Sequence, residues 1–146
     1  MEINTYKSVE DLNDNEFSVI RDFLFEHLDQ FGDAKEDIAK AMDYSLGKGG
    51  NPGGFILSTS DNGNVVGAVV VNETGMKGYI PENILVYIAT HKDYRGKGVG
   101  KQLMLKAMDT ANGDVALHVE PDNPARHLYQ KLGFTNKYLE MRYKKG

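Results

Sequence analysis

A short basic segment rich in glycine contains the residues best suited to chemistry. It runs from Arg95 to Lys101 and reads Arg-Gly-Lys-Gly-Val-Gly-Lys, after a predicted strand and before a predicted helix. The first turn of a helix has free backbone N–H groups and the positive end of the helix dipole. Glycines let such a backbone turn sharply and let a phosphate approach closely. The segment therefore predicts a pyrophosphate site, and Arg95, Lys97 and Lys101 would add electrostatic attraction.

Two familiar nucleotide-binding patterns do not fit this segment. A Walker A loop needs a glycine five residues before its Gly-Lys pair and a Ser or Thr after it, but Arg95 and Gln102 stand at those places around Gly100 and Lys101. A dinucleotide fingerprint needs a glycine where Lys101 stands. On the segment alone, two interpretations stay open: a coenzyme A site, and a glycine-rich turn that binds no ligand.

A second segment, from Asp122 to Phe134, follows the next predicted strand. Asp122 or Asn123 can cap a helix there, and Pro124 suits its first turn. Gly133 ends that helix, and Tyr129 lies near its end. The tyrosine is either a proton donor at a site or a half-buried helix side chain.

Together the two segments resemble the GNAT superfamily of acyl-CoA-dependent N-acetyltransferases. Arg95 to Gly100 matches the family's Arg/Gln-x-x-Gly-x-Gly/Ala motif, and Ala125 to Phe134 matches its Ala-x-x-Leu-Tyr-x-x-x-Gly-Phe pattern. The resemblance implies acetyl-CoA as co-substrate, no metal, and direct transfer of an acetyl group to a primary amine of a small molecule or a protein. A non-catalytic acyl-CoA-binding sensor or regulator stays open as the alternative.

The resemblance also assigns roles to residues. Tyr129 matches the family's usual general acid for the departing thiolate, and Glu82 stands where some protein-acetylating members have a catalytic glutamate. The family often has an asparagine at the position of Asp122, so either Asp122 or the neighbouring Asn123 would contact the cofactor. The implied cofactor-binding residues are Ile88, Ala89, Thr90, Arg95, Gly96, Lys97, Gly98, Val99, Gly100, Lys101, Asp122, Asn123 and Tyr129.

The group that accepts the proton of the amine stays open. An alkyl amine with a pKa of about 10.4 is mostly protonated at neutral pH, and making it neutral costs roughly 4–5 kcal/mol. Glu82 is the first candidate, although it could equally be a solvated carboxylate at a strand end. Glu120, His118 and a chain of waters are the others. A regular strand would align Glu82 with Ile88 on one face, and a bulge would break that alignment.

The elements that must position these residues follow from hydrophobic periodicity. An amphipathic helix begins near Ser8 and ends at Gly32, and further helices cover about 33–46, 99–111 and 124–132. Predicted strands cover residues 3–6, 55–60, 65–71, 80–90, 115–119 and 134–143. This order describes one mixed α/β domain over residues 1–146. The resemblance adds a mostly antiparallel, twisted sheet of about six strands, splayed at the strand before the glycine segment and flanked by about four helices.

Composition and charge fit this interpretation. The chain has 146 residues, of which 40% are hydrophobic and 26% charged, as in one globular domain. The net charge is −4, yet residues 91–106 carry five basic side chains and one acidic one, which favours a local anion site over a nucleic-acid surface. No signal segment, membrane-length apolar run or cysteine is present, so we expect a cytoplasmic protein without membrane contact. Many GNAT members pair as dimers, so the resemblance allows a homodimer, and the sequence leaves the oligomeric state open.

The sequence does not specify the acceptor. Residues 1–46 carry twelve acidic and four basic side chains. Such a surface could attract a cationic amine, or it could be no more than a solvated helix face.

Overall fold

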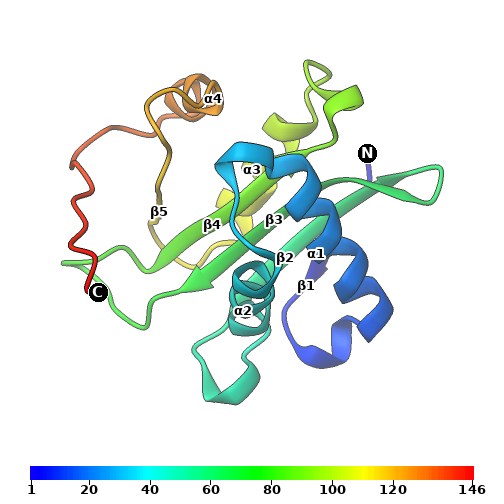
Figure 1. Ribbon diagram of the computed structural model, residues 1–146, viewed down its shortest axis with the longest axis horizontal. Helices are drawn as coiled ribbons and strands as arrows, with labels where there is room; N and C mark the ends of the chain where they lie inside the picture. Colours follow the sequence, from blue (N-terminus) through cyan, green and yellow to red (C-terminus); the bar gives the residue numbers. More distant parts are fainter.

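Five strands form one sheet whose order in space follows the order along the chain (Figure 1). The computed structural model describes residues 1–146. The strands are β1 (Asn4–Tyr6), β2 (Gly54–Asp61), β3 (Asn64–Glu73), β4 (Asn83–Thr90) and β5 (Val115–Leu117). Neighbouring strands are antiparallel except β4 and β5, which run parallel. The connection from β4 to β5 therefore crosses over one face of the sheet.

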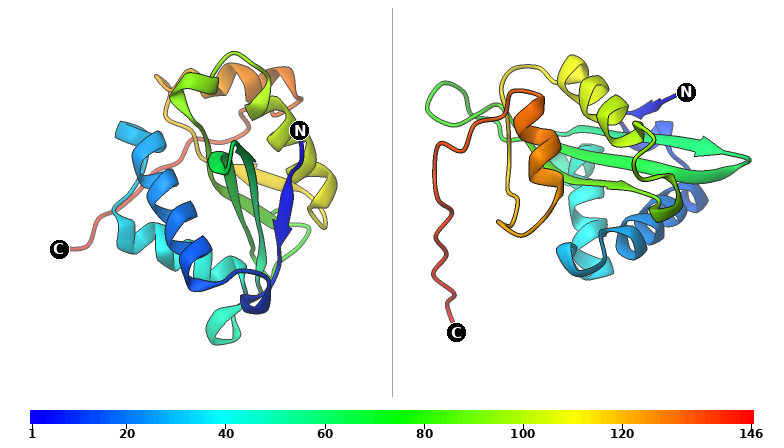
Figure 2. Two further views of the ribbon diagram at one scale, coloured as in Figure 1. Left: turned by 90° about the vertical axis from the view of Figure 1, so that its right-hand side faces the viewer. Right: turned by 90° about the horizontal axis from the view of Figure 1, so that it is seen from above.

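Four α-helices cover the two faces of this sheet. They are α1 (Asp14–Leu28), α2 (Lys35–Ser45), α3 (Val99–Thr110) and α4 (Ala125–Lys131). The edge-on view shows α1 and α2 on one face and α3 on the other (Figure 2). No helix combines the length and the hydropathy that crossing a bilayer requires.

Each face of the sheet has its own hydrophobic core. On one face, Leu24, Ile38 and Met42 from α1 and α2 pack on Ile56 and Val70. On the other face, α3 and α4 pack on the sheet, and Leu103 and Met104 are wholly buried there. Strand β3 is buried on both faces from Val66 to Val71, which explains its nearly continuous apolar sequence.

Two start signals compete at the beginning of the first helix. Ser8 and Asp11 form a capping box, as the sequence predicts, but this box opens only a single 3₁₀ turn, Val9–Asp11. A second capping box follows at once, in which the Asn13 side chain accepts the Glu16 N–H at 2.8 Å. The predicted start near Ser8 is therefore wrong by six residues, because the second box caps the apolar-periodic stretch that makes the helix.

Strand β4 contains a bulge at Val86. Val70 of β3 pairs with Tyr87, but the next residue, Val71, pairs with Leu85, so Val86 has no partner on β3. Val86 consequently packs in the core under α1 and α2, whereas Ile88 packs in the core under α3. The bulge breaks the one-face alignment that a regular strand would give.

The sheet opens between β4 and β5. Their parallel pairing covers only the three residues from Asn83 to Leu85 of β4. From Val86 to Thr90, the edge of β4 that faces away from β3 has no strand beside it. The splay expected at the strand before the glycine segment is thus present.

The predicted last strand, residues 134–143, does not form. After α4, Leu132 and Phe134 stay packed against the α3 face, and the chain from Thr135 onward is exposed and leaves the sheet (Figure 2). Its alternating apolar side chains suit a strand, but a strand exists only through hydrogen bonds to a neighbour, and none is paired here. The sheet therefore has five strands rather than about six.

Candidate active site

A cleft of about 750 Å³ lies at the carboxyl end of β4. Four segments far apart in sequence meet around it: the end of α1 with the turn after it, the end of β4, the glycine segment, and α4 (Figure 1). Its walls therefore come from helices on both faces of the sheet and from the end of strand β4. This convergence matches what a binding site requires.

Most residues predicted to bind a cofactor line this cleft. They are Ile88, Ala89, Thr90, Arg95, Gly96, Gly98, Val99, Gly100, Lys101, Asn123 and Tyr129. Lys97 and Asp122 do not line it. The Lys97 ammonium instead lies 5.1 Å from the centre of the Tyr94 ring.

The glycine segment presents free backbone amides at the start of α3. The first bond of this helix end runs from the Gln102 N–H to the Gly98 carbonyl, so the N–H groups of Val99, Gly100 and Lys101 have no helical acceptor. Gly98 has a φ of 84°, and a Cβ built there would meet nothing within 4 Å. The backbone is therefore left-handed and uncovered where a phosphate would approach.

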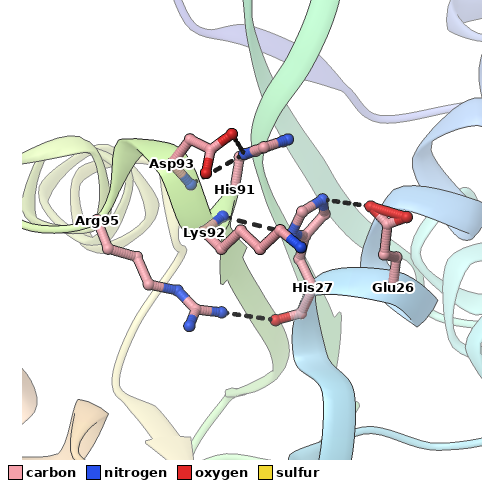
Figure 3. Close-up of polar contacts among 6 residues, drawn as sticks. All are labelled: Glu26, His27, His91, Lys92, Asp93 and Arg95. Carbon is pink, nitrogen blue, oxygen red and sulfur yellow. Dashed lines mark hydrogen bonds and ion pairs between the residues drawn. The ribbon is translucent and has the colours of Figure 1, made fainter.

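The basic side chains of this region are not neutralised by carboxylates. Arg95, Lys97 and Lys101 take part in no ion pair. The Arg95 Nη2 donates a hydrogen bond to the backbone carbonyl of His27 at 3.1 Å, a neutral partner (Figure 3). The positive charge of this segment is therefore available to attract an anion.

Tyr129 is the titratable side chain set deepest in the predicted site. It is 7% exposed, and burial raises its pKa to about 12. Its hydroxyl makes no hydrogen bond within the chain and is not among the enclosed polar atoms, so it opens to the cleft. A phenol in this state keeps its proton at neutral pH and can donate it.

The structure separates Asp122 from Asn123. Asn123 lines the cleft, and its Oδ1 accepts the Ala125 N–H at 2.9 Å at the start of α4. Asp122 is exposed and does not line the cleft. Of the two residues, only Asn123 therefore lies where a ligand of the cleft could touch it.

Glu82 does not reach the cleft. It precedes β4, and its Oε1 accepts the Asp114 N–H at 3.4 Å beside the turn between α3 and β5. Six residues separate it from Ile88, or about 20 Å along a strand. Glu120 and His118 are exposed and line no part of the cleft either.

Sequence reasoning placed no cofactor-binding residue on the first helix, although the end of this helix contributes a wall of the cleft. Residues 27–31, from the end of α1 and the 3₁₀ turn after it, line the cleft together with Tyr94, Pro124 and Leu128. One member, Asp29, has a φ of 52° that is unusual for a residue other than glycine. Gly32 marked the end of the helix in the sequence, but nothing there indicated that this end returns to the glycine segment.

No group of three or more His, Asp or Glu side chains is arranged to hold a metal ion. The residues that are present fit a coenzyme A instead. The three free amides suit its pyrophosphate, and the unpaired edge of β4 suits the amide groups of its pantetheine arm.

The chain matches the model of the acetyltransferase (GNAT) family over residues 11–134. N-alpha-acetyltransferase 30 of Schizosaccharomyces pombe is 29% identical over 94 residues, which is 61% of this chain. The chain spans 63% of the length of that relative.

Solved structures show the same fold at low sequence identity. The ribosomal-protein-S18-alanine N-acetyltransferase of Escherichia coli is 17% identical, with a TM-score of 0.66 over 94% of this chain and 80% of that one. Aminoglycoside N-acetyltransferase AAC(6')-Iy in complex with CoA is 15% identical, with a TM-score of 0.67 over 99% and 95% of the two chains. By the match over residues 11–134 and by this fold, the chain belongs to the acetyltransferase (GNAT) family.

Proposed function

We propose that this protein is an acetyl-CoA-dependent N-acetyltransferase that moves the acetyl group to a primary amine by direct attack. One observation carries the proposal: a single cleft holds the free amides at the start of α3, the unpaired edge of β4 and the open hydroxyl of Tyr129. These are an anion site, a site for an extended amide chain and a proton donor. A protein that only bound acyl-CoA would have no use for the third.

The chain would hold its co-substrate largely by backbone groups. The N–H groups of Val99, Gly100 and Lys101 would bind the pyrophosphate oxygens, and Asn123 lines the same cleft. The backbone of Ile88 to Thr90 would bind the pantetheine arm along the strand edge. Acetyl-CoA would supply an acetyl group already activated as a thioester.

Tyr129 would donate its proton to the sulfur of coenzyme A as the C–S bond breaks. Its raised pKa keeps the phenol protonated, so the donor is in the right state over the whole neutral range. Its position on α4 brings it to the cleft that the end of β4 also lines. We therefore propose Tyr129 as the catalytic acid.

The proton of the amine must leave by another route. Glu82, the catalytic base expected from the sequence, lies beyond the cleft and could act there only through a chain of waters. We propose that water in the open cleft takes the proton first.

The amine class stays broad. The names of the relatives above mention an alpha nitrogen, an alanine of a ribosomal protein and aminoglycosides. We propose a primary amine of a peptide or small molecule. Peptides with free N-termini deserve the first test, because the sequence relative is an N-alpha-acetyltransferase.

The decisive experiment is a screen of N-terminal peptides, lysine peptides, polyamines and aminoglycosides with acetyl-CoA, which follows thiol release. We expect one class of amine to stimulate the release of free thiol from acetyl-CoA and the other classes to have little effect. Titrations with coenzyme A, ATP and an oligonucleotide accompany the screen. Binding of coenzyme A without turnover on any amine would favour the sensor or regulator, and no binding of coenzyme A would remove the proposal.

We also propose a homodimer in the cytoplasm, where acetyl-CoA is available. Tyr138, Leu139, Met141 and Tyr143 are 79–90% exposed, and the outer edge of β5 is unpaired. A second copy that placed its residues 135–143 along β5 would cover both features.

A dimer of this kind predicts association that depends on concentration. We expect light scattering to find dimers at micromolar concentration, and Leu139→Ser with Met141→Ser to give monomers. The variant should keep its thermal stability as a monomer, because neither side chain is buried. A wild-type protein that stays monomeric at every concentration would contradict the dimer.

A further inference from the structure

His27 joins the end of α1 to the chain that leads into the glycine segment. It lies in the last turn of α1 and is 6% exposed. Its ring Nδ1 accepts the backbone N–H of Lys92 at 3.4 Å, and its carbonyl accepts Nη2 of Arg95 at 3.1 Å (Figure 3). One residue of α1 thus holds two points, Lys92 and Arg95, in the first half of the stretch between β4 and the free amides.

The proton arrangement of the ring suits this role. Nε2 lies 2.8 Å from Oε2 of Glu26, so it carries the hydrogen and leaves Nδ1 as an acceptor. Burial lowers the pKa of His27, and the nearby His91, Arg95 and Lys92 lower it further against the opposing effect of Glu26. The neutral ring with a free Nδ1 is therefore the form that the surroundings favour.

The ring is also fixed in place by its neighbours. It stacks on Phe23 at 4.7 Å and on His91 at 4.2 Å between ring centres. It forms part of the wall between the cleft and a second cavity of about 490 Å³, which α1 and the β2–β3 hairpin line. A side chain held between two rings and hydrogen-bonded to a backbone N–H is a rigid anchor.

The other ties of this stretch come from the opposite side. The His91 N–H donates to the Val66 carbonyl at 2.8 Å, and the Tyr94 hydroxyl donates to Asp61 at 2.5 Å. Both of those partners belong to the β2–β3 hairpin region. Only His27 connects the stretch to the helix whose end forms a wall of the cleft.

We propose that His27 is a positioning residue for acetyl-CoA: its Nδ1 anchors residues 92–95 to α1 and so fixes the amides that receive the pyrophosphate. The inference rests on the proposed function, because it assumes that the cleft binds acetyl-CoA. His27 touches no reacting atom in this role. Its loss should weaken binding and leave the chemical step alone.

Two substitutions separate anchoring from packing. His27→Asn offers a carbonyl oxygen that can accept the Lys92 N–H, whereas His27→Leu fills the apolar space but accepts nothing. The carbonyl bond to Arg95 is a backbone contact and survives in both. If His27 only packs, His27→Leu should be at least as stable as His27→Asn and should bind acetyl-CoA at least as tightly, because leucine buries more apolar surface.

We expect the order of stability and the order of affinity to be opposite. In thermal unfolding, His27→Leu should match or exceed His27→Asn. In calorimetry, His27→Leu should bind acetyl-CoA about three- to tenfold more weakly than His27→Asn, the loss expected for one hydrogen bond. At saturating acetyl-CoA, kcat should be equal in both. His127→Asn, which removes an exposed histidine of α4 outside the cleft, serves as the control.

A second measurement does not depend on acetyl-CoA. In the ligand-free protein, hydrogen exchange at the Lys92 amide should be faster in His27→Leu than in His27→Asn. Equal exchange, or equal affinity of the two variants, would overturn the inference while the proposed function stands. A wild-type protein that binds no acetyl-CoA would overturn the proposed function and, with it, the anchoring of acetyl-CoA.

Discussion

At the scale of single residues, Tyr129 lines the cleft and Glu82 does not, although the sequence predicted both as catalytic residues of one reaction. Tyr129 is buried, open to the cleft and protonated, whereas Glu82 lies near the turn after α3. The difference is that Tyr129 belongs to a segment whose spacing fixes its position on α4. Glu82 was placed by its distance along a strand that the bulge at Val86 interrupts.

Tyr129→Phe tests the proton donor. The substitution keeps the ring and removes the hydroxyl, so we expect kcat to fall about a hundredfold with little change in the KM for acetyl-CoA. Steady-state kinetics with the best amine of the screen measures both constants. Full turnover in the variant would show that the sulfur leaves without help from the phenol.

The same residue predicts the shape of the pH profile. The acid form of Tyr129 is present below its pKa of about 12. Activity should therefore rise with pH as the amine loses its proton, and it should not decline again through Tyr129 below about pH 11. A descending limb near neutral pH would point to another essential acid.

Glu82→Gln tests the base. The carboxylate lies outside the cleft, so we expect kcat to stay within about threefold of the wild-type value. Glu120→Gln, at an exposed carboxylate that also lies outside the cleft, serves for comparison. A loss of about a hundredfold in Glu82→Gln alone would restore the catalytic glutamate expected from the sequence.

At the scale of elements, the position of α3 decides whether its free amides face the cleft. Helix α3 packs directly on β3 at Gly67, where an added Cβ would lie 2.6 Å from Cδ1 of Leu103 and 3.1 Å from Cγ1 of Val99. The absence of a side chain there allows the helix to lie close to the sheet. The distance between helix and sheet therefore depends on this glycine.

Gly67→Val should push α3 away from the sheet. We expect the free energy of unfolding to fall by about 1–3 kcal/mol, as for other overpacked cores, and acetyl-CoA binding to weaken as well. Denaturant titration and calorimetry measure the two effects. Ser60→Val adds a similar side chain at an exposed position of β2 and should change neither. Unchanged binding in Gly67→Val would mean that the amides do not depend on this packing.

Sequence patterns predicted the elements whose signals are local. The glycine segment, the helix after it and the two strands predicted over residues 55–60 and 65–71 are all present. The strand over residues 134–143 is absent, because alternation shows only that a segment could pair and not that a partner is beside it. The bulge at Val86 and the return of the α1 end to the cleft are set by contacts between distant segments, which no local pattern contains.

At the scale of the whole molecule, charge is distributed unevenly around the cleft. The net charge is −4, and Arg95, Lys97 and Lys101 of the glycine segment take part in no ion pair. The negative charge of the protein as a whole repels anions, whereas the basic side chains of the glycine segment attract them to the cleft. Such a field raises the rate of encounter with a negatively charged ligand.

Lys101→Gln tests this effect against Lys106→Gln, which removes the same charge from α3 outside the cleft. At low ionic strength we expect Lys101→Gln to weaken acetyl-CoA binding about three- to tenfold and Lys106→Gln to change it little. The difference should shrink as salt shortens the reach of the charge to about 10 Å and less. Equal effects of the two variants would mean that general charge, and not the local field, attracts the ligand.

The three-residue pairing of β4 with β5 gives acetyl-CoA a further role. Where a sheet would normally continue with another strand, the pantetheine arm would take the place of that strand. The ligand would then complete the sheet, and in the protein without it the edge of β4 from Val86 to Thr90 would lack a partner. At a hundredfold excess over its Kd, such a ligand adds about 2.7 kcal/mol to stability. The cellular concentration of acetyl-CoA would thereby influence the stability of the folded protein as well as the rate of its reaction.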